Sequence, residues 1–200
     1  MEKNRGRQLF GKYRTIIMFF ISIIKVLPKW FLKNRFEAHR FTRGKIGITI
    51  RYMFLKALAQ KCGDNVAIYP GAYILHPENL KIGNNVSIHP MCYLECGSNP
   101  EQCLQIDDDV SIAHGVTIMT TSHIYDQPDI PIKYCSCKKE KVHICSNVWI
   151  GAKATILMGR TIASGCVIGA NAVVTKDTET DKIYAGVPSR AIRSRFPQQP

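Results

Sequence analysis

The chain has 200 residues, of which 46% are hydrophobic, and its 27 Lys and Arg against 15 Asp and Glu give a formal net charge of +12 at pH 7. This length and apolar content fit one globular domain with a small appendage, and they exclude a disordered chain. Residues 1–61 hold 15 basic and 2 acidic side chains, whereas residues 62–200 hold 12 and 13. A protein that bound nucleic acid over its whole fold would spread its charge, so we expect a neutral main body, a basic N-terminal extension and no nucleic-acid partner.

Cysteine usage indicates the compartment. The chain has 8 cysteines, and its N-terminus lacks the short apolar stretch with a small-residue cleavage site that marks a secretory signal. This combination is typical of a reducing cytosol and not of a disulfide framework. We therefore expect a cytoplasmic protein.

The extension, residues 1–61, contains two predicted helices. Residues 15–27 read TIIMFFISIIKVL, and their basic flanks include Lys12, Arg14, Lys29 and Lys33. These 13 residues fall well short of the ~20 that span a bilayer as a helix. They would either lie on an anionic membrane surface, at the inner face of the cell membrane, or pack against the domain itself. Residues 48–61 (ITIRYMFLKALAQK) predict an amphipathic helix that ends before Gly63.

From residue 62 onwards an aliphatic residue recurs every six positions. The recurring residues are Ile82, Ile88, Leu94, Ile106, Ile112 and Ile118, then Ile144, Ile150, Ile156, Ile162, Ile168 and Val174. A period of six is a multiple of two, so extended segments can point every aliphatic side chain at one axis, which an α-helix cannot do. The pattern predicts a mainly β protein, a parallel β-helix of hexapeptide repeats over residues 62–183, because the strands of a β-sandwich do not keep one period for so long.

Two segments interrupt the six-residue pattern. They are residues 95–105 (ECGSNPEQCLQ) and the longer residues 124–142 (IYDQPDIPIKYCSCKKEKV). We expect both to leave the β-helix as loops, and long excursions from a compact domain tend to carry function. The longer one follows His123 directly.

Three segments carry a resemblance to a known family. Residues 148–177 read VWIGAKATILMGRTIASGCVIGANAVVTKD, residues 184–193 read YAGVPSRAIR, and TTSHIYD stands upstream at residues 120–126. In this order they resemble the left-handed β-helix O-acetyltransferases of the maltose and galactoside type, over about residues 62–195. The basic extension resembles that of members that modify capsule or lipopolysaccharide sugars. The resemblance implies left-handed coils, a homotrimer, acetyl-CoA as co-substrate in the groove between adjacent prisms, and direct acetyl transfer to a hydroxyl.

The resemblance also places the catalytic histidine at His123. A sugar hydroxyl is a poor nucleophile at neutral pH, and a positioned imidazole can take its proton as attack on the thioester begins. Either Asp126, three residues on, or a backbone carbonyl would orient the ring. The sequence contains no G-x-S-x-G motif, so an acyl-serine intermediate is not expected.

Residues implied by the resemblance to contact coenzyme A are Trp149, Ala152, Ala170, Thr175, Lys176, Arg190 and Arg193. The two alanines would let the pantetheine arm approach the backbone, and the basic side chains would face the phosphates. On the acceptor side the sequence departs from the family, because residues 92–96 (CYLEC) stand where small-sugar members have an asparagine. Tyr93 and Glu95 are therefore the acceptor-binding candidates.

Several other interpretations of the sequence have to be considered, and two of them involve a metal ion. A C-x-C-x5-H-x-C pattern is formed by Cys135, Cys137, His143 and Cys145. Its spacing matches no standard zinc knuckle, so we expect no metal there. A zinc-dependent β-helix lyase of the carbonic anhydrase type would use His89, His114 and His123, but that signature has two histidines five positions apart, and His114 and His123 are nine apart. A small-sugar or xenobiotic acetyltransferase and a catalytically idle scaffold also stay open.

The sequence thus predicts three parts: a basic helical extension (residues 1–61), a β-helix acyltransferase domain (62–183) and a C-terminal tail (184–200). We expect a homotrimeric acetyltransferase that modifies a hydroxyl of a cell-surface polysaccharide sugar or of its lipid-linked precursor. The expected acceptor is a sugar or polysaccharide, and the extension would bring the enzyme to an anionic membrane surface.

Overall fold

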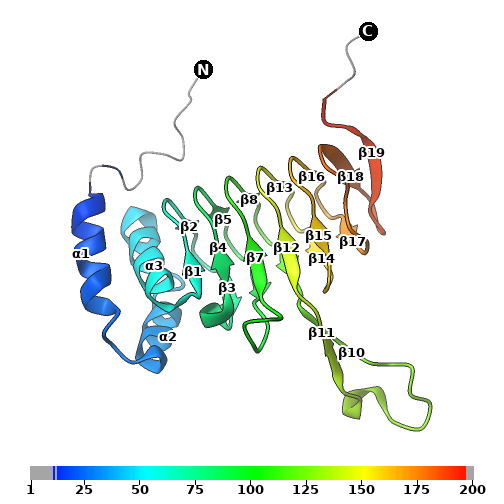
Figure 1. Ribbon diagram of the computed structural model, residues 1–200, viewed down its shortest axis with the longest axis horizontal. Helices are drawn as coiled ribbons and strands as arrows, with labels where there is room; N and C mark the ends of the chain where they lie inside the picture. Colours follow the sequence, from blue (N-terminus) through cyan, green and yellow to red (C-terminus); the bar gives the residue numbers. More distant parts are fainter. Residues whose placement is uncertain (1–10, 12, 197–200) are drawn as a thin grey trace.

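The computed structural model describes residues 11 and 13–196. Three helices at the N-terminal end lead into a stack of short strands, and a hairpin projects from the middle of that stack (Figure 1). The helices are α1 (Arg14–Ile24), α2 (Lys29–Ala38) and α3 (Gly44–Leu58), with short 3-10 turns at η1 (Pro77–Asn79) and η2 (Ile132–Tyr134).

The strands form three sheets that run along the stack. Sheet A contains β1 (Lys61–Cys62), β4 (Lys81–Ile82), β7 (Leu104–Ile106), β12 (Val142–Ile144) and β15 (Thr161–Ile162). Sheet B contains β2 (Ala67–Ile68), β5 (Ser87–Ile88), β8 (Ser111–Ile112), β13 (Trp149–Ile150), β16 (Val167–Ile168), β18 (Lys182–Ala185) and β19 (Arg190–Ser194). Sheet C contains β3 (Tyr73–Leu75), β6 (Tyr93–Glu95), β9 (Thr117–Ile118), β14 (Thr155–Ile156) and β17 (Val173–Val174). Each coil visits A, B and C in turn, so the domain is a three-sided prism with A–B, B–C and C–A corners.

The six-residue pattern is the core of this prism. Every aliphatic residue of the two predicted runs is buried, with at most 1% of its surface exposed. Parallel pairing stacks equivalent positions of successive coils, as in Ile88 with Ile112 and Ile150 with Ile168. Burying each such side chain is worth about 1.5–3 kcal/mol, and no single coil could bury its own set alone. The predicted parallel β-helix of hexapeptide repeats is confirmed.

Left-handed backbone conformations let the chain turn at the A–B corner. Asn65, Asn85, Asp109 and Asn147 adopt φ values of 57° to 60° at equivalent positions of successive coils. Asn and Asp tolerate this region better than other residues with a side chain. Their side chains also join neighbouring coils, since Asn65 Nδ2 donates to Asn85 Oδ1 at 3.1 Å and Asn85 Nδ2 donates to Asp109 Oδ1 at 2.9 Å.

The N-terminal helices close one end of the prism. α1 and α2 pack on α3, and α3 packs on β1, β2 and η1. Leu55 and Leu58 of α3 are buried against the first coil. Arg51 is buried as well, and its guanidinium donates to Ile68 O of β2 at 2.9 Å and to Thr42 O at 2.7 Å. α3 begins at Gly44 and ends at Leu58, so the helix expected at residues 48–61 is displaced towards the N-terminus, because residues 61 and 62 already pair in sheet A.

α1 packs one face on the protein and exposes the other, so packing is observed and a membrane contact stays a prediction. Ile17 and Ile21 are buried against the rest of the protein, whereas Ile16, Phe19 and Ile23 are 57%, 62% and 49% exposed. Among the described residues no helix is both long and apolar enough to cross a bilayer. Lys12, one of the expected basic flanks, lies outside the described residues.

Both interruptions leave the prism at the C–A corner, between a strand of sheet C and the next strand of sheet A. The shorter one joins β6 to β7. The longer one is a hairpin and not a loop, because β10 (Thr121–His123) pairs antiparallel with β11 (Cys137–Lys139). The excursion therefore starts before His123, which lies within β10, and projects away from the stack (Figure 1).

The C-terminal tail belongs largely to the prism. β18 crosses the boundary that we expected at residues 183 and 184, and it adds a parallel strand to sheet B. β19 then pairs antiparallel with β18 at the edge of that sheet. The last residues of the predicted tail, 197–200, lie outside the described residues.

The A–B corner supplies a test of how closely the coils stack. A Cβ atom on Gly83 would lie 2.3 Å from Asp108 Oδ1 and 2.8 Å from the backbone carbon of Asp107. We expect Gly83→Ala to destabilise the protein by about 1–3 kcal/mol, because backbone of the next coil must shift. Thermal unfolding measures the effect, and Gly11→Ala, where the added Cβ meets nothing within 4 Å, is the matched control. Equal melting temperatures for both variants would contradict this packing.

Candidate functional site

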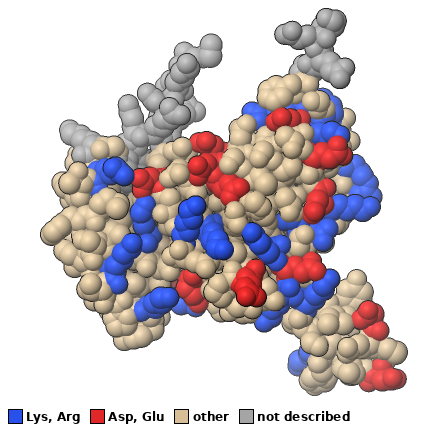
Figure 2. All heavy atoms as spheres, viewed as in Figure 1, with Lys and Arg blue, Asp and Glu red and all other residues tan. Residues whose placement is uncertain are grey.

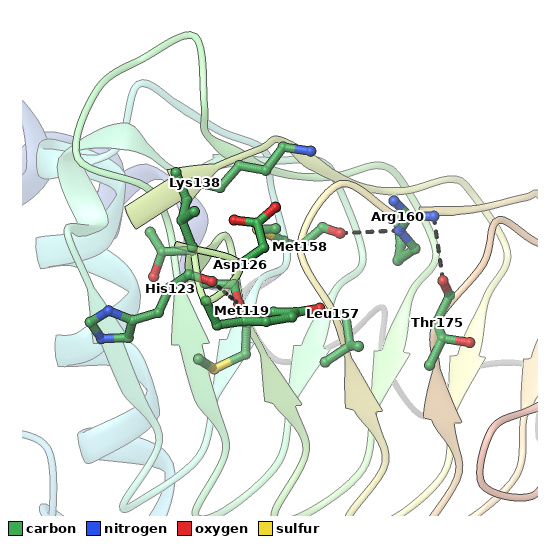
Figure 3. Close-up of a pocket in the computed structure, with 12 residues that line it drawn as sticks. Met119, His123, Asp126, Lys138, Leu157, Met158, Arg160 and Thr175 are labelled. Atoms are coloured by element: carbon green, nitrogen blue, oxygen red, sulfur yellow. Dashed lines mark hydrogen bonds between the residues drawn. The ribbon is translucent and has the colours of Figure 1, made fainter. Parts of the chain in front are cut away.

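A pocket of about 510 Å³ lies at the C–A corner, beside the base of the hairpin (Figure 3). Residues after β9, β14 and β17 form one wall, and the hairpin forms the other. The lining residues are Met119, Thr121, Ser122, His123, Ile124, Tyr125, Asp126, Lys138, Leu157, Met158, Arg160 and Thr175. The pocket thus brings together both predicted catalytic residues and one predicted cofactor residue, Thr175.

His123 owes its position to the hairpin. Hydrogen bonds from Ile124 N to Ser136 O and from Glu140 N to Thr120 O, both 2.9 Å, make His123 and Cys137 a non-hydrogen-bonded pair, in which side chains lie closest. The imidazole Nδ1 is 3.9 Å from Cys137 Sγ. The ring is exposed, and within residues 13–196 its Nε2 makes no hydrogen bond.

Asp126 lines the same pocket without holding the imidazole. Figure 3 shows the ring of His123 directed away from the carboxylate of Asp126. In the described part of the chain no hydrogen bond joins the two residues, so an orienting role for Asp126 stays a prediction. The sequence did not indicate that Cys137 would lie beside His123, because that contact depends on the register of a hairpin with no periodic pattern.

Arg160 is a pocket residue that the sequence analysis missed. Its guanidinium donates to Met158 O at 3.1 Å and to Thr175 O at 3.4 Å (Figure 3). It also lies 3.9 Å from a carboxylate oxygen of Glu140, which follows β11. Arg160 therefore links the hairpin to the last two coils and closes one side of the pocket.

The acceptor candidates Tyr93 and Glu95 lie on β6, one coil from the pocket. The Tyr93 ring packs on Tyr73 with centroids 5.6 Å apart, and burial followed by the negative charge of Glu95 raises the pKa of its phenol. Tyr93 is therefore a neutral hydrogen-bond donor at pH 7. Glu95 is only 8% exposed, and its carboxylate accepts hydrogen bonds from Thr120 and Thr121. Contact of either residue with an acceptor stays a prediction.

Most of the predicted coenzyme A residues lie along sheet B and the B–C corner. Trp149 is 55% exposed on β13, and Ala152 and Ala170 follow β13 and β16 at that corner. The coils approach closely there, since a Cβ on Gly151 would lie 2.6 Å from Ala170 N. At positions 152 and 170 this corner therefore carries only methyl groups, next to the longer side chains of Lys153 and Asn171.

The basic residues of the predicted cofactor site carry uncompensated charge. Arg190 and Arg193 are exposed on β19, and each guanidinium donates only to a neighbouring backbone carbonyl, Ser189 O and Ser194 O. Lys176 is exposed as well. Among the described residues none of the three forms an ion pair, so all are available to an anionic ligand such as a phosphate.

The two predicted halves of the site stand at different corners of one prism. His123 and Thr175 lie at the C–A corner, whereas Ala152 and Ala170 lie at the B–C corner, and sheet C separates the corners. A single prism therefore does not bring the predicted general base next to most of the predicted cofactor residues.

The C-x-C-x5-H-x-C pattern does not form one cluster. Cys135 Sγ lies near the carbonyl oxygens of Ile130 and Pro131, and Cys137 lies beside His123. His143 and Cys145 instead join Asp107 at the A–B corner, where their ligand atoms lie within 4.8 Å of one another. His143 Nε2 is 2.8 Å from Asp107 Oδ2. Burial opposes ionisation of Asp107, but hydrogen bonds from Gln105 and His143 lower the pKa of its carboxyl group.

The histidines of the lyase alternative form no metal-ligand group within the described part of one chain. His89 stacks on Tyr69, and burial followed by the charge of His114 lowers the pKa of its imidazole. No metal geometry within the described chain favours the lyase.

Comparisons with known proteins agree with this architecture. Residues 141–176 match the family model described as bacterial transferase hexapeptide (six repeats). The galactoside O-acetyltransferase of Escherichia coli K12 is 28% identical over 180 residues, which covers 87% of this chain and 83% of that protein.

Solved structures give the same result. A galactoside acetyltransferase in complex with coenzyme A has a TM-score of 0.70 and 27% identity, covering 83% of this chain and 80% of the other. A maltose O-acetyltransferase from Clostridium difficile 630 shares the fold, with a TM-score of 0.69, 24% identity and coverage of 86% and 88%. The resemblance found in the sequence is confirmed: over most of its length this chain is similar to galactoside and maltose O-acetyltransferases, which supports a hexapeptide-repeat, acetyl-CoA-dependent O-acetyltransferase of that type.

Proposed function

We propose that this protein moves acetyl from acetyl-CoA to a hydroxyl of a cell-surface polysaccharide sugar or its lipid-linked precursor, with His123 as the general base. His123 is the observation that carries the proposal. Its exposed imidazole stands at a pocket large enough for a sugar ring, and Nε2 has no hydrogen-bond partner within the described chain. A ring nitrogen in that state can accept the proton of a bound hydroxyl.

The reaction then balances in one transfer. His123 Nε2 takes the hydroxyl proton as the oxygen attacks the thioester carbonyl, so the C–O bond forms. The C–S bond breaks as the carbonyl re-forms, and the imidazolium returns its proton to the departing thiolate. The products are the acetylated sugar and free coenzyme A, with no covalent enzyme intermediate.

Acetyl-CoA fits the exposed residues of sheet B and the B–C corner. Trp149 offers a flat apolar face, the small side chains of Ala152 and Ala170 expose backbone amides, and Arg190 and Arg193 offer charge to the phosphates, whereas Lys176 follows Thr175 at the C–A corner. Because these residues and His123 occupy different corners, a complete site needs the B–C corner of one copy beside the C–A corner of another. This arrangement supports a homotrimer with the cofactor between adjacent prisms.

The helical end supports an acceptor held at a membrane. Phe19 on α1, Val26 on the segment between α1 and α2, and Trp30 on α2 are 62%, 81% and 67% exposed. Lysines accompany them at positions 25, 29 and 33, and Figure 2 shows basic side chains among residues without charge at this end. Apolar and aromatic side chains with basic neighbours suit the interface of an anionic bilayer. We therefore place the proposed reaction at the inner face of the cell membrane.

The acceptor class is tested in cells. Mass spectrometry of the cell-surface glycan, from cells with and without this protein, should show an acetyl group that depends on the chain and on His123. A glycan that is unchanged when the gene is removed would contradict a polysaccharide acceptor.

His123→Ala should lower kcat by about 10²- to 10⁴-fold, because the imidazole acts on the hydroxyl proton. The dissociation constant of coenzyme A should stay nearly the same. Thiol release from acetyl-CoA, with maltose or a galactoside as surrogate acceptor, measures the rate, and His76→Asn at the far end of the prism is the control. A His123→Ala protein with more than about a tenth of the wild-type kcat would disprove the general-base role.

Replacing Arg190 and Arg193 together by Gln should raise the Michaelis constant for acetyl-CoA more than it lowers kcat. Phosphate contacts are remote from the reacting carbonyl and bind ground and transition states alike. Steady-state kinetics with varied acetyl-CoA provide the measurement, and replacing Lys45 and Lys61 together by Gln, two exposed charges at the opposite end of the protein, controls for net charge. An unchanged Michaelis constant would show that these arginines do not contact the cofactor.

Phe19→Glu combined with Val26→Glu should abolish binding to vesicles that contain anionic lipid, because it places charge where apolar side chains would enter the interface. The wild-type protein should bind anionic vesicles better than neutral ones, and salt should weaken that binding. Vesicle sedimentation measures both effects. Phe196→Glu, the same change near the C-terminus, should bind like the wild type. Equal binding of the wild type to anionic and neutral vesicles would disprove the membrane interpretation.

A further inference from the structure

Glu95 connects the two excursions at the C–A corner. It is the last residue of β6, directly before the shorter excursion. β6 pairs with β9 so that Leu94 lies beside Ile118, which places Glu95 next to the start of the hairpin in the neighbouring coil. Its Oε2 accepts hydrogen bonds from Thr120 N at 3.0 Å and Thr121 N at 3.2 Å, and its Oε1 accepts one from Thr121 Oγ1 at 2.8 Å.

These bonds hold the segment that leads directly into His123. The hairpin has only two short strands, and such a pair has little stability of its own. Glu140 N also donates to Thr120 O at 2.9 Å, so both strands of the hairpin meet at the residue that Glu95 fixes. Hydrogen bonds to a carboxylate are about twice as strong as neutral ones, and this carboxylate is shielded from water.

From this geometry we infer that Glu95 is a positioning residue for His123. Its carboxylate fixes the backbone of residues 120 and 121, which directs β10 so that the imidazole stands at the pocket. This inference rests on the proposed role of His123 as general base. Glu95 acts through that backbone and not on the acceptor, because it is buried, with 8% of its surface exposed, and its carboxylate is directed at the hairpin backbone and Thr121.

The first experiment measures Glu95→Ala and Glu95→Gln in the full-length protein. Displacing a reacting group by about 1 Å can cost about 10²-fold in rate, so we expect kcat with a surrogate acceptor to fall by about 10- to 10²-fold. Michaelis constants for acetyl-CoA and the acceptor should change less than about twofold. Each rate is divided by the concentration of protein that binds coenzyme A, so unfolded protein does not lower the measured kcat. A raised acceptor Michaelis constant with kcat unchanged would show direct acceptor contact and overturn the inference.

Thr121 provides a second variant that leaves Glu95 intact. Thr121→Val removes only the hydroxyl bond to Oε1, so kcat should fall by less than in Glu95→Ala. Thr121→Ser keeps a hydroxyl and should lose less activity than Thr121→Val. Equal losses in the valine and serine variants would contradict the role of this bond, and the comparison holds even if Glu95→Ala fails to fold.

A double variant separates positioning from every other role. If Glu95 acts through His123, then Glu95→Ala should cost less than about twofold more in a His123→Ala protein, since the imidazole is already absent. If Glu95→Ala instead lowers kcat by the same factor with and without His123, Glu95 does not act through His123 and the inference is overturned. A His123→Ala protein that keeps its activity would instead disprove the proposed function, so the two failures are distinguishable.

Discussion

Burial of one aliphatic side chain in every six along a single axis is the interaction on which the rest of this structure depends. It fixes the rise of the coils and the pairing of all three sheets, because Ile88, Ile112, Ile150 and Ile168 and their counterparts can only stack in one register. Once that register is set, each remaining position belongs to a sheet or to a corner. Functional residues are therefore distributed by their place in the repeat and not by proximity in sequence.

The residues of the proposed site are then divided between two corners. The C–A corner releases both excursions, carries His123 on β10 and receives the anchoring carboxylate of Glu95 from the neighbouring coil. The B–C corner keeps small residues and close backbone contacts, as around Gly151 and Ala170. The open end of the prism is closed by α3, whose buried Leu55 and Arg51 join it to the first coil. That leaves the outer side of α1 as exposed apolar surface.

The sequence predicted the parts of the structure that follow the six-residue pattern and missed the parts that do not. The coils and their core followed from the six-residue pattern, because that pattern is local and repeats along the whole prism. The hairpin has no such pattern, so the approach of Cys137 to His123 and the anchoring of Thr121 by Glu95 could not be predicted. α3 was misplaced for a similar reason, since Arg43 at its start makes no side-chain capping bond that a sequence signal would mark.

In the site proposed above, the C–A corner of one copy works with the B–C corner of another. Mixing tests it most directly: His123→Ala is combined with Ala152→Trp, a variant designed to block the cofactor surface, and mixed oligomers are isolated by differential tags. The mixture should regain acetyl transfer although each parent alone is inactive, because one interface in the mixed oligomer retains both intact corners. Verified mixed oligomers with no more activity than the parents would contradict it.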